Sequence, residues 1–429
     1  MSLEEIYNIF LNYPQITTDS RTATENSIFF ALKGEQFDGN QFASVALQNG
    51  AAFAVVDDPL VVAGKRFILV PDVLKTLQGL AEIHRRHFKA KVIGITGSNG
   101  KTTTKELVGK VLASTFNTVI TAGNLNNHIG VPLSMLTVKP DTEFAVIEMG
   151  ANHIGEIAEL CRLAQPGYGI ITNIGKAHLE GFGGFPGVIK AKSELYDFLR
   201  LNNGLVFLNS DNNLLVNLAN GMNTVTFGSD NKALCTGTIK NRDPFLSVEW
   251  RKGSTSGLIN SRLYGDYNFE NIMAAVAVGL FFGVDQAKIN SAIENYIPEN
   301  NRSQVLNTGK NRIILDAYNA NPSSMKAALE TFSQKPAENK MVILGDMMEL
   351  GDQSMEEHRN IIDLIEELDF DKVIYIGEHF CKAISGNKTI CFPDTGAFIS
   401  WLASNPVSNR TILLKGSRKM RLETLINLL

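Results

Sequence analysis

The chain has 429 residues, which is too long for one hydrophobic core, so the sequence predicts two or three domains. Hydrophobic residues make up 44% of it and charged residues 20%; the net charge is −4 with no basic block, which is typical of a globular enzyme and argues against a nucleic-acid partner. No apolar run approaches the roughly 18 residues of a membrane span, the N-terminal stretch does not resemble a secretory signal, and the four cysteines form no CxxC pair. We therefore expect a cytoplasmic monomer with reduced thiols.

Strands and helices alternate along the chain in three successive units. The first, residues 1–88, is expected to contain a helix at 41–50 and strands at 27–34, 51–58 and 66–70. The second, residues 89–301, is expected to contain strands at 91–96, 144–150 and 169–175, helices at 102–113 and 268–283, and an antiparallel patch within 221–262. The third, residues 302–429, is expected to contain strands at 311–318, 340–346, 372–377 and 411–416. This alternation predicts parallel, helix-covered sheets and an α/β fold.

A glycine-rich turn, GITGSNGKTTT (94–104), joins the strand at 91–96 to the next helix and is close to a phosphate loop. The usual pattern, G-x-x-x-x-G-K-[ST], would place a glycine at position 95, but Ile95 stands there and the glycines are at 94 and 97. Backbone N–H groups at a helix N-terminus can bind phosphate in such a turn, because glycine lets the ligand approach closely. We therefore expect Lys101 to contact the β- and γ-phosphates of ATP and the Thr102 hydroxyl to bind Mg²⁺.

The turn resembles the ATP-binding loop of the Mur ligases, the enzyme family that builds the peptide stem of bacterial peptidoglycan. In that family the glycines stand at the positions found here. Further stretches resemble the family's motifs in the same order: TDSR (18–21), SIFFALKGEQFDGNQF (27–42), GNLNNHIGVPLSML (123–136), IEMGANHIGEI (147–157), NIGKAHLEGFG (173–183), AKSE (191–194), GDYNFENIMAA (265–275), DAYNANPSSM (316–325), LGDMMELG (344–351) and LKGSRKMRLE (414–423). The last three resemble in particular the family member that adds a dipeptide.

The resemblance implies three domains: a small N-terminal α/β domain that binds a nucleotide sugar, a central ATPase domain with the phosphate loop and a mostly parallel sheet, and a C-terminal Rossmann-like α/β domain. It also implies an ATP-dependent ligase that joins D-alanyl-D-alanine to the carboxylate of UDP-N-acetylmuramoyl-tripeptide through an acyl phosphate. Such phosphoryl transfer depends on charge neutralisation and in-line positioning more than on a covalent enzyme group.

The resemblance further implies the residues of the site. The catalytic residues would be Lys101, Glu148, His178 and Lys192. The ligands of two Mg²⁺ ions would be Thr102, Glu148, His178 and a Lys192 carbamoylated by CO₂. ATP would be bound by Gly97, Ser98, Asn99, Gly100, Lys101, Thr102, Thr103, Asn268, Asn271, Arg302 and Asp316. The substrates would be bound by Ser20, Arg21, Phe30, Lys33, Asn126, Asn127, Tyr318, Asn319, Asn321, Lys415, Ser417 and Arg418. A basic residue would pair with the dipeptide's free carboxylate, and the sequence does not say which.

One motif departs from the family's pattern, because the early DGH reads Asp38-Gly39-Asn40 here, which puts the recognition of the nucleotide sugar in question. LGDMMELG (344–351) is equally consistent with a structural turn, and we assign it no catalytic role. Two alternatives stay open. One is a related ligase that adds a single amino acid, such as another Mur ligase or a folylpolyglutamate synthetase; the other is a binding protein on a ligase scaffold. The YNANP stretch argues against the first, and the complete set of catalytic residues argues against the second.

Overall fold

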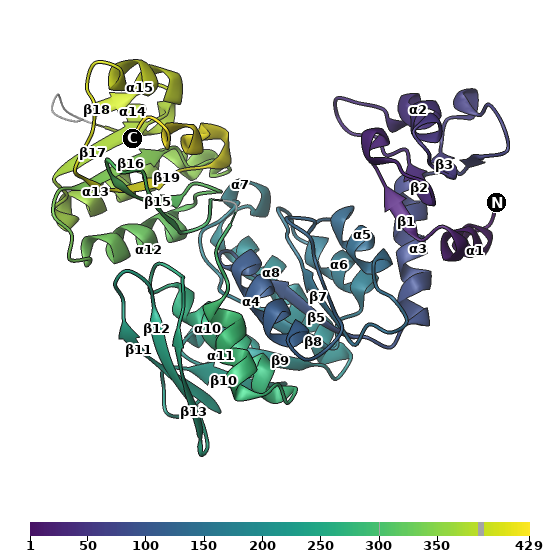
Figure 1. Cartoon of the computed structure of the whole chain (residues 1–429), viewed down its shortest axis with the longest axis horizontal. Helices are drawn as coiled ribbons and strands as arrows, with labels where there is room; N and C mark the ends of the chain where they lie inside the picture. Colours follow the sequence, from purple (N-terminus) through teal and green to yellow (C-terminus); the bar gives the residue numbers. More distant parts are fainter. Residues whose placement is uncertain (300, 385–389) are drawn as a thin grey trace.

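Three sheets follow one another along the chain in the computed structural model, which describes residues 1–299, 301–384 and 390–429 (Figure 1). Parallel strands dominate all three sheets, so the predicted α/β fold is confirmed. The strands of the three sheets lie within 15–69, 91–260 and 304–415. The domain limits at 88 and 301 stay a prediction.

The first sheet is small and fully parallel, with its strands in sequence order: β1 (Gln15–Thr17), β2 (Ser27–Phe30), β3 (Phe53–Val56) and β4 (Phe67–Leu69). Its helices are α1 (Leu3–Asn12), α2 (Ala43–Gln48) and α3 (Val73–His87), with short 3₁₀ turns η1 (Ser20–Thr22), η2 (Gly39–Phe42) and η3 (Pro59–Val61). Helix α3 contacts α1 and also the helices α5 and α6 of the second unit. This long helix therefore joins the N-terminal unit to the rest of the molecule (Figure 1).

The second sheet has the order β13-β12-β11-β10-β9-β8-β5-β7-β6. Its strands are β5 (Lys91–Thr96), β6 (Thr118–Ile120), β7 (Phe144–Glu148), β8 (Tyr168–Ile171), β9 (Leu205–Asn209), β10 (Asn223–Gly228), β11 (Cys235–Asn241), β12 (Ser247–Lys252) and β13 (Thr255–Asn260). Its helices are α4 (Lys101–Ala113), α5 (Gly130–Leu136), α6 (Glu156–Ala164), α7 (Leu179–Phe182), α8 (Phe185–Leu201), α9 (Asn213–Leu218), α10 (Asn268–Phe281) and α11 (Gln286–Glu294). The antiparallel patch expected within 221–262 is present as β11, β12 and β13.

The third sheet has the order β14-β15-β19-β16-β17-β18 and is parallel except for its edge strand β14. Its strands are β14 (Gln304–Asn307), β15 (Arg312–Asp316), β16 (Lys340–Gly345), β17 (Lys372–Ile376), β18 (Ile390–Phe392) and β19 (Thr411–Lys415). Its helical elements are α12 (Pro322–Ser333), η4 (Gly351–Gln353), α13 (Ser354–Leu368), α14 (Glu378–Ala383), α15 (Thr395–Leu402), η5 (Arg418–Met420) and η6 (Leu422–Leu425).

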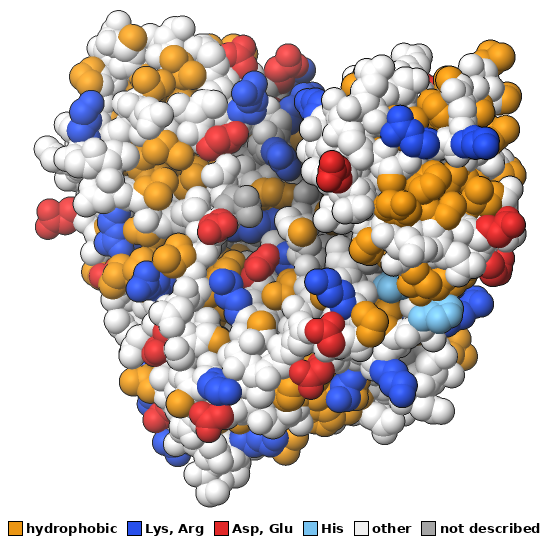
Figure 2. All heavy atoms as spheres, turned by 45° about the vertical axis from the view of Figure 1, so that its right-hand side comes forward, with side chains coloured by type: hydrophobic (Ala, Val, Ile, Leu, Met, Phe, Trp, Pro, Cys, Tyr) orange, Lys and Arg blue, Asp and Glu red, His pale blue; other side chains and the backbone are white. Residues whose placement is uncertain are grey.

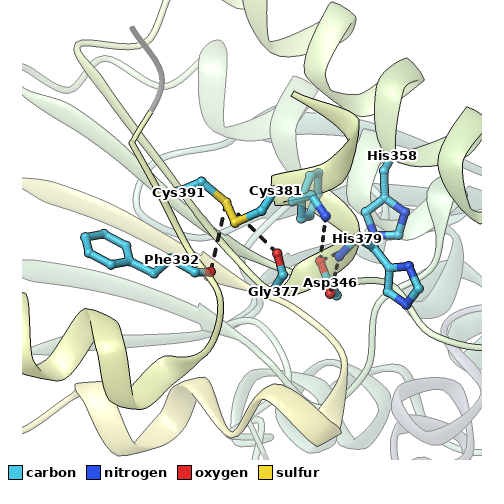
Figure 3. Close-up of a disulfide and its surroundings, with 8 residues drawn as sticks. Asp346, His358, Gly377, His379, Cys381, Cys391 and Phe392 are labelled. Atoms are coloured by element: carbon cyan, nitrogen blue, oxygen red, sulfur yellow. Dashed lines mark hydrogen bonds and ion pairs between the residues drawn. A yellow bond between two sulfur atoms is a disulfide. The ribbon is translucent and has the colours of Figure 1, made fainter. Parts of the chain in front are cut away.

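Two cysteines of the third unit form a disulfide (Figure 3). Cys381 lies in α14 and Cys391 in β18, and their Cα atoms are 5.7 Å apart, within the range that a disulfide can bridge. The expectation of four reduced thiols is therefore wrong for this pair, because the fold packs α14 against β18. Cys161 and Cys235 are free and buried, and burial raises the pKa of the Cys235 thiol to about 12.

The carboxyl ends of the parallel strands determine where a site can form. Strands β5, β7 and β8 adjoin in the central sheet, and β15 and β19 adjoin in the third. In open α/β sheets, ligands bind in the crevice beyond these ends. Figure 2 shows a furrow between the N-terminal unit on the right and the C-terminal unit at the upper left, with basic and acidic side chains along its walls. None of the described helices is long and apolar enough to cross a lipid bilayer.

Candidate active site

A cleft of about 870 Å³ lies between the second and third units. The predicted site residues that line it are Ser98, Asn99, Gly100, Lys101, Thr102, Thr103, Asn126, Asn127, Glu148, His178, Asn268, Asn271, Arg302, Asp316, Tyr318, Asn319, Asn321, Lys415 and Arg418. The predicted residues outside this lining are Gly97, Lys192, Ser417 and the four N-terminal residues Ser20, Arg21, Phe30 and Lys33. The fold thus gathers most of the predicted ATP-binding and acceptor-binding residues around one cavity.

The glycine-rich turn has the backbone of a phosphate loop. Gly97 and Gly100 adopt φ values of 144° and 78°, which side-chain-bearing residues rarely adopt, and Gly100 directly precedes α4. The Lys101 Nζ donates to the carbonyl oxygens of Gly97 (2.8 Å) and Ser98 (3.1 Å) and so bends back over the turn. Burial lowers the pKa of Lys101 to about 8, Glu148 opposes this shift, and Arg302 adds to it. A bound anion would favour the charged form of this lysine.

A second loop, at the start of the NIGKAHLEGFG stretch (173–183), holds the turn in place. Ser98 Oγ donates to the Gly175 carbonyl (3.0 Å) and accepts from the Gly175 N–H (2.9 Å). The Asn99 N–H donates to Asn173 Oδ1 (3.0 Å), and its carbonyl accepts from Thr172 Oγ1 (2.6 Å). These contacts depend on the adjacency of β5 and β8, so only the sheet order could reveal them.

Glu148 offers a free carboxylate oxygen to a cation. This residue ends β7 and is 1% exposed, and its Oε1 accepts hydrogen bonds from Thr102 Oγ1 (3.2 Å) and Asn126 Nδ2 (2.7 Å). Its Oε2 is buried and has no hydrogen-bond partner in the described part of the chain. A buried carboxylate oxygen without a partner is costly unless a cation neutralises it, and Mg²⁺ prefers oxygen ligands. The Thr102–Glu148 pair therefore fits a Mg²⁺ ion.

No group of three or more His, Cys, Asp and Glu side chains among the described residues could hold a metal ion. Mg²⁺ is commonly bound by one or two protein ligands together with substrate phosphates, which agrees with a site of this kind. The predicted metal ligands His178 and Lys192 make other contacts, described below, and the roles of both stay predictions.

Lys105 anchors the strand-to-loop segment that carries Asn126. Its side chain is fully buried, and its Nζ donates to the carbonyl oxygens of Thr121 (2.7 Å) and Gly123 (3.3 Å) and pairs with Glu106 (2.6 Å). The Thr121 hydroxyl in turn accepts from the Glu148 N–H (3.0 Å). Lys105 lies one helical turn beyond Lys101 in α4.

His178 connects the central unit to the LGDMMELG stretch. His178 adopts a left-handed backbone conformation (φ 51°) at the start of α7, and its Nδ1 forms an ion-pair contact with the Glu349 carboxylate. This contact lowers the pKa of Glu349, and the Glu349 carbonyl also accepts the Glu180 N–H (3.2 Å). Left-handed non-glycine residues cost free energy and are concentrated at functional sites. Glu349 also lines the cleft, which the sequence did not predict.

Asp346 shows why the rest of LGDMMELG is structural. Its buried carboxylate accepts the N–H groups of His379 (3.0 Å) and Phe380 (2.9 Å) at the start of α14 (Figure 3). Its carbonyl accepts the Ser417 N–H (3.1 Å), which fixes the loop that follows β19. Ser417 itself is buried and does not line the cleft, so its predicted contact with substrate is not supported by its position.

Lys192 is a buried lysine without a carboxylate partner among the described residues. It is 1% exposed, its Nζ donates to the Ala151 carbonyl (3.2 Å), and it lies 5.0 Å from the centre of the Phe182 ring. Burial lowers the pKa of Lys192 to about 7, and the charge of Lys101 adds to this effect. Near neutral pH, Lys192 is therefore an uncharged amine in a substantial fraction of the protein molecules.

Amides of α10 lie directly behind the phosphate loop. Asn271 Nδ2 donates to Asn268 Oδ1 (2.8 Å), and Asn271 Oδ1 accepts from Thr104 Oγ1 (2.9 Å) of α4. The remaining bond of Asn268 goes to the Tyr264 carbonyl (2.8 Å). Both amides line the cleft, but several of their hydrogen-bonding groups already have protein partners. Their contact with adenine stays a prediction.

Three asparagines predicted to bind substrate also shape the backbone. Asn127 Oδ1 accepts the N–H groups of Ile129 (3.1 Å) and Gly130 (2.9 Å), so it holds the turn that leads into α5. Asn319 Oδ1 accepts the N–H of the next residue (3.0 Å). Asn321 caps α12, and its Nδ2 donates to Asn99 Oδ1 (2.8 Å) across the cleft. Asn321 therefore links the third unit to the phosphate loop.

The N-terminal candidates lie apart from the cleft. Phe30 does not fit its predicted role as a ligand contact, because every side chain of β2 is buried and Phe30 is 0% exposed in the hydrophobic core. Ser20 is buried and Arg21 is exposed and paired with Asp19 (2.7 Å). Ser20, Arg21 and Lys33 stay predictions as contacts of the nucleotide sugar.

Asn40, the departure from the family's motif, is buried and structural. Its Nδ2 donates to Asp38 Oδ1 and Asp57 Oδ1 (both 2.8 Å), and its Oδ1 accepts the Asp57 N–H (3.1 Å). Lys33 pairs with the same Asp57 carboxylate (2.9 Å). The amide donates two N–H bonds from Nδ2 and accepts at Oδ1, whereas a neutral imidazole has only one N–H donor.

The fold and the cleft define a class of protein. A phosphate loop with an adjacent cation site faces a second α/β unit that contributes cationic side chains, an arrangement suited to phosphoryl transfer between bound substrates. The chain thus has the architecture of a multidomain ATP-binding enzyme.

Comparison with known proteins gives the family. Residues 12–88 match the description "Mur ligase family, catalytic domain", residues 95–279 match "Mur ligase middle domain", and residues 301–418 match "Mur ligase, glutamate ligase domain". The chain is 35% identical to the UDP-N-acetylmuramoyl-tripeptide–D-alanyl-D-alanine ligase of Bacillus subtilis, over 96% of this chain and 92% of that protein. The chain belongs to the Mur ligase family.

Solved structures agree with this assignment. A crystal structure of MurF from Acinetobacter baumannii has a TM-score of 0.88 and 30% identity, and covers 100% of this chain and 98% of that chain. The MurF ligase of Thermotoga maritima in complex with ADP has a TM-score of 0.84 and 28% identity, and covers 97% of each chain.

Proposed function

We propose that this protein is an ATP-dependent amide ligase that joins D-alanyl-D-alanine to the carboxylate end of a UDP-N-acetylmuramoyl-tripeptide, in the synthesis of peptidoglycan precursors. The single observation that carries the proposal is the cleft in which the phosphate loop, the unpartnered Glu148 oxygen and the YNANP and KGSR stretches converge. The full-length similarity to ligases named for this reaction supports the same substrates.

In the first step, the tripeptide carboxylate attacks the γ-phosphorus of ATP, which yields an acyl phosphate and ADP. The backbone N–H groups at the start of α4 and the Lys101 ammonium bind the phosphates and balance their charge, while the Asn99 N–H is held by Asn173. Thr102 Oγ1 and Glu148 Oε2 would hold Mg²⁺, which supplies further positive charge to the phosphates when bound. Asn126, which donates to Glu148, keeps that carboxylate oriented.

In the second step, the amino group of the dipeptide attacks the acyl carbon, and inorganic phosphate leaves. No covalent enzyme group is required. The third unit contributes by holding the dipeptide next to the acyl phosphate. Tyr318, Asn319 and Arg418 line the third unit's part of the cleft and hold the dipeptide there, and Lys415 pairs with Asp316. Asp316 would contact the ribose of ATP.

We also propose that Lys192 is carbamoylated in the active enzyme. An uncharged lysine amine attacks CO₂ and releases one proton, which gives a carbamate anion in place of an ammonium. Burial and the nearby Lys101 charge favour the uncharged amine, and the carbamate would be attracted to the same Lys101 and to Mg²⁺. With His178, it would provide oxygen and nitrogen ligands for a second Mg²⁺ ion.

The principal test measures phosphate release by the purified protein with ATP, Mg²⁺, the sugar-nucleotide tripeptide and D-alanyl-D-alanine. We expect release to require both organic substrates and to fall by at least about 10³-fold in a Lys101→Ala variant that remains folded. Release with meso-diaminopimelate, L-lysine or glutamate in place of the dipeptide would contradict the proposed acceptor. Normal turnover by the Lys101→Ala variant would contradict the phosphate role of the loop.

The carbamate has a separate test. After incubation with ¹³C-bicarbonate, the wild-type protein is expected to show a carbamate carbonyl resonance that a Lys192→Met variant lacks. The resonance should disappear in acid, because carbamates lose CO₂ when protonated. Identical spectra for the two proteins would refute the carbamate and leave the ligase proposal unaffected.

A further inference from the structure

Four cationic side chains line the cleft, and the structure gives them different surroundings. They are Lys101, Arg302, Lys415 and Arg418. The sequence leaves open which basic residue pairs with the free carboxylate of the dipeptide. The contacts of each cation with protein groups narrow that choice. A cation that is paired with a carboxylate attracts a second anion only weakly, because the carboxylate offsets its positive potential.

Lys415 is committed to another residue. It is 1% exposed, and its Nζ forms an ion pair of 2.5 Å with Asp316 Oδ2. The other oxygen of Asp316 accepts the Ser303 N–H (3.2 Å), so the lysine fixes a carboxylate that is itself anchored to the linker between the units. If Lys415 turned to a ligand instead, it would leave the largely buried Asp316 carboxylate without a cation, which is costly. Lys101 is likewise held over the phosphate loop.

The two arginines are held by an aromatic ring and not by a carboxylate. The guanidinium carbon of Arg302 lies 3.7 Å from the centre of the Tyr318 ring, and that of Arg418 lies 5.4 Å from it. Neither arginine forms an ion pair with another described residue, and Arg302 Nε is buried without a partner. A cation–π contact orients a guanidinium while its N–H donors remain free for a planar anion.

The two arginines differ in position. Arg302 is close enough to Lys101 for its charge to affect that lysine, which places it on the phosphate side of the cleft. Arg418 begins η5 after β19, lines the cleft and is exposed to solvent. An acceptor that enters from solvent and leaves its carboxylate outermost would meet Arg418 first.

We propose that Arg418 binds the free carboxylate of the dipeptide, that Tyr318 is a positioning residue that orients the Arg418 and Arg302 guanidinium groups, and that Lys415 acts only through Asp316. This division of roles rests on the proposed ligase function. Arg302 then binds the ATP phosphates. The Tyr318 ring holds Arg302 and Arg418 at a fixed position relative to each other. A bidentate guanidinium–carboxylate pair suits the planar end of a dipeptide.

The test compares two acceptors, D-alanyl-D-alanine and its C-terminal amide, which lacks the negative charge. The wild-type enzyme is expected to lose roughly 10- to 100-fold in kcat/KM when the amide replaces the dipeptide, the range of one charge-assisted hydrogen-bonding contact. The Arg418→Met variant should lose a similar factor with the dipeptide and nearly nothing more with the amide. The change should appear in KM for the acceptor, while KM for ATP shifts less than about twofold.

Matched variants separate the roles. Lys415→Met should still discriminate between the two acceptors and should raise KM for ATP, because Asp316 loses its cation. Tyr318→Phe retains the ring and should keep the discrimination, whereas Tyr318→Leu should weaken it and raise KM for both ATP and the acceptor. Arg418→Lys retains the charge without the planar fork and should fall between wild type and Arg418→Met.

The proposal is wrong if Arg418→Met discriminates against the amide as strongly as the wild type, or if Lys415→Met alone abolishes the discrimination. Circular dichroism and a cooperative urea-unfolding transition verify that each variant is folded. A wild-type protein that releases no phosphate in response to the dipeptide would instead refute the ligase function itself, so the two failures are distinguishable.

Discussion

Lys105→Met tests whether a buried lysine behind the phosphate loop supports both the fold and the cation site. Methionine resembles the lysine side chain up to its last carbon but lacks the terminal amino group and cannot donate a hydrogen bond. The substitution leaves the buried Thr121 carbonyl unpartnered, which costs about 1–3 kcal/mol, whereas the exposed Gly123 carbonyl can turn to water. The lost pairing with the partly exposed Glu106 adds at most about 1 kcal/mol.

Part of this cost is offset, because the folded state no longer has to bury an ammonium group. We therefore expect the free energy of unfolding to fall by about 2 kcal/mol. The assay is urea unfolding followed by circular dichroism. Lys110→Met, in an exposed position of the same helix, is the control and should change stability by less than about 0.5 kcal/mol.

The same substitution should weaken ligand binding, because the segment that carries Asn126 loses its anchor and Asn126 orients Glu148. We expect the dissociation constant of an ATP analogue with Mg²⁺, measured by calorimetry, to rise about tenfold, which corresponds to about 1.4 kcal/mol. An unfolding free energy within about 0.5 kcal/mol of wild type would refute the energetic argument. Unchanged binding in a destabilised variant would refute the link from Lys105 through Asn126 to the cation site.

Three further predictions concern the backbone, a histidine and the disulfide. Gly97→Ala should lower ATP-analogue affinity by more than about tenfold in calorimetry, because φ is 144° and the new methyl group would collide with Thr172. His358→Gln should reduce the loss of unfolding free energy that the wild type shows below pH 6.5. Burial lowers the pKa of His358 in the folded state, so acid protonates this histidine first in the unfolded chain. This costs the wild type up to about 1.4 kcal/mol of stability per pH unit, as measured by unfolding at a series of pH values. Cys381→Ser should cost about 2–3 kcal/mol of unfolding free energy without reductant, because it opens a ten-residue loop.

Each of these predictions has its own control. Gly283→Ala has a φ of 77° but open space around the added methyl group, so it separates backbone strain from collision. For the histidine, the Met347 N–H donates to His358 Nε2 (3.1 Å), which requires a neutral ring; equal pH profiles for wild type and variant would contradict this. For the disulfide, wild type and variant should have nearly equal stability in dithiothreitol, and a persistent difference would point to packing instead.

The sequence predicted the elements that depend on local pattern. The apolar strands at 91–96, 144–150 and 340–346 and the buried helix at 268–283 lie close to β5, β7, β16 and α10, because continuous apolar runs between turn residues belong to parallel, helix-covered strands. The phosphate loop was readable for the same reason, since the strand, the glycines and the helix are contiguous in the chain.

Contacts between distant segments could not be predicted in this way. The Ser98–Gly175 and Asn99–Asn173 bonds, the Lys105 anchor and the Glu349–His178 contact each depend on the order of strands or on the approach of the third unit. The burial of Phe30 has the same origin, because a motif match does not show that the fold buries every side chain of β2.

The chain by itself therefore determined the chemistry that is available, namely a phosphate-binding turn, a carboxylate at a strand end and a supply of cations. Only the tertiary structure decided how these groups are used. Lys415 is neutralised by Asp316, whereas Arg302 and Arg418 lie against Tyr318 with their donors free. The physical reason is that the charge a side chain can offer to a ligand depends on its nearest neighbours in space, and those neighbours come from parts of the chain that the sequence keeps far apart.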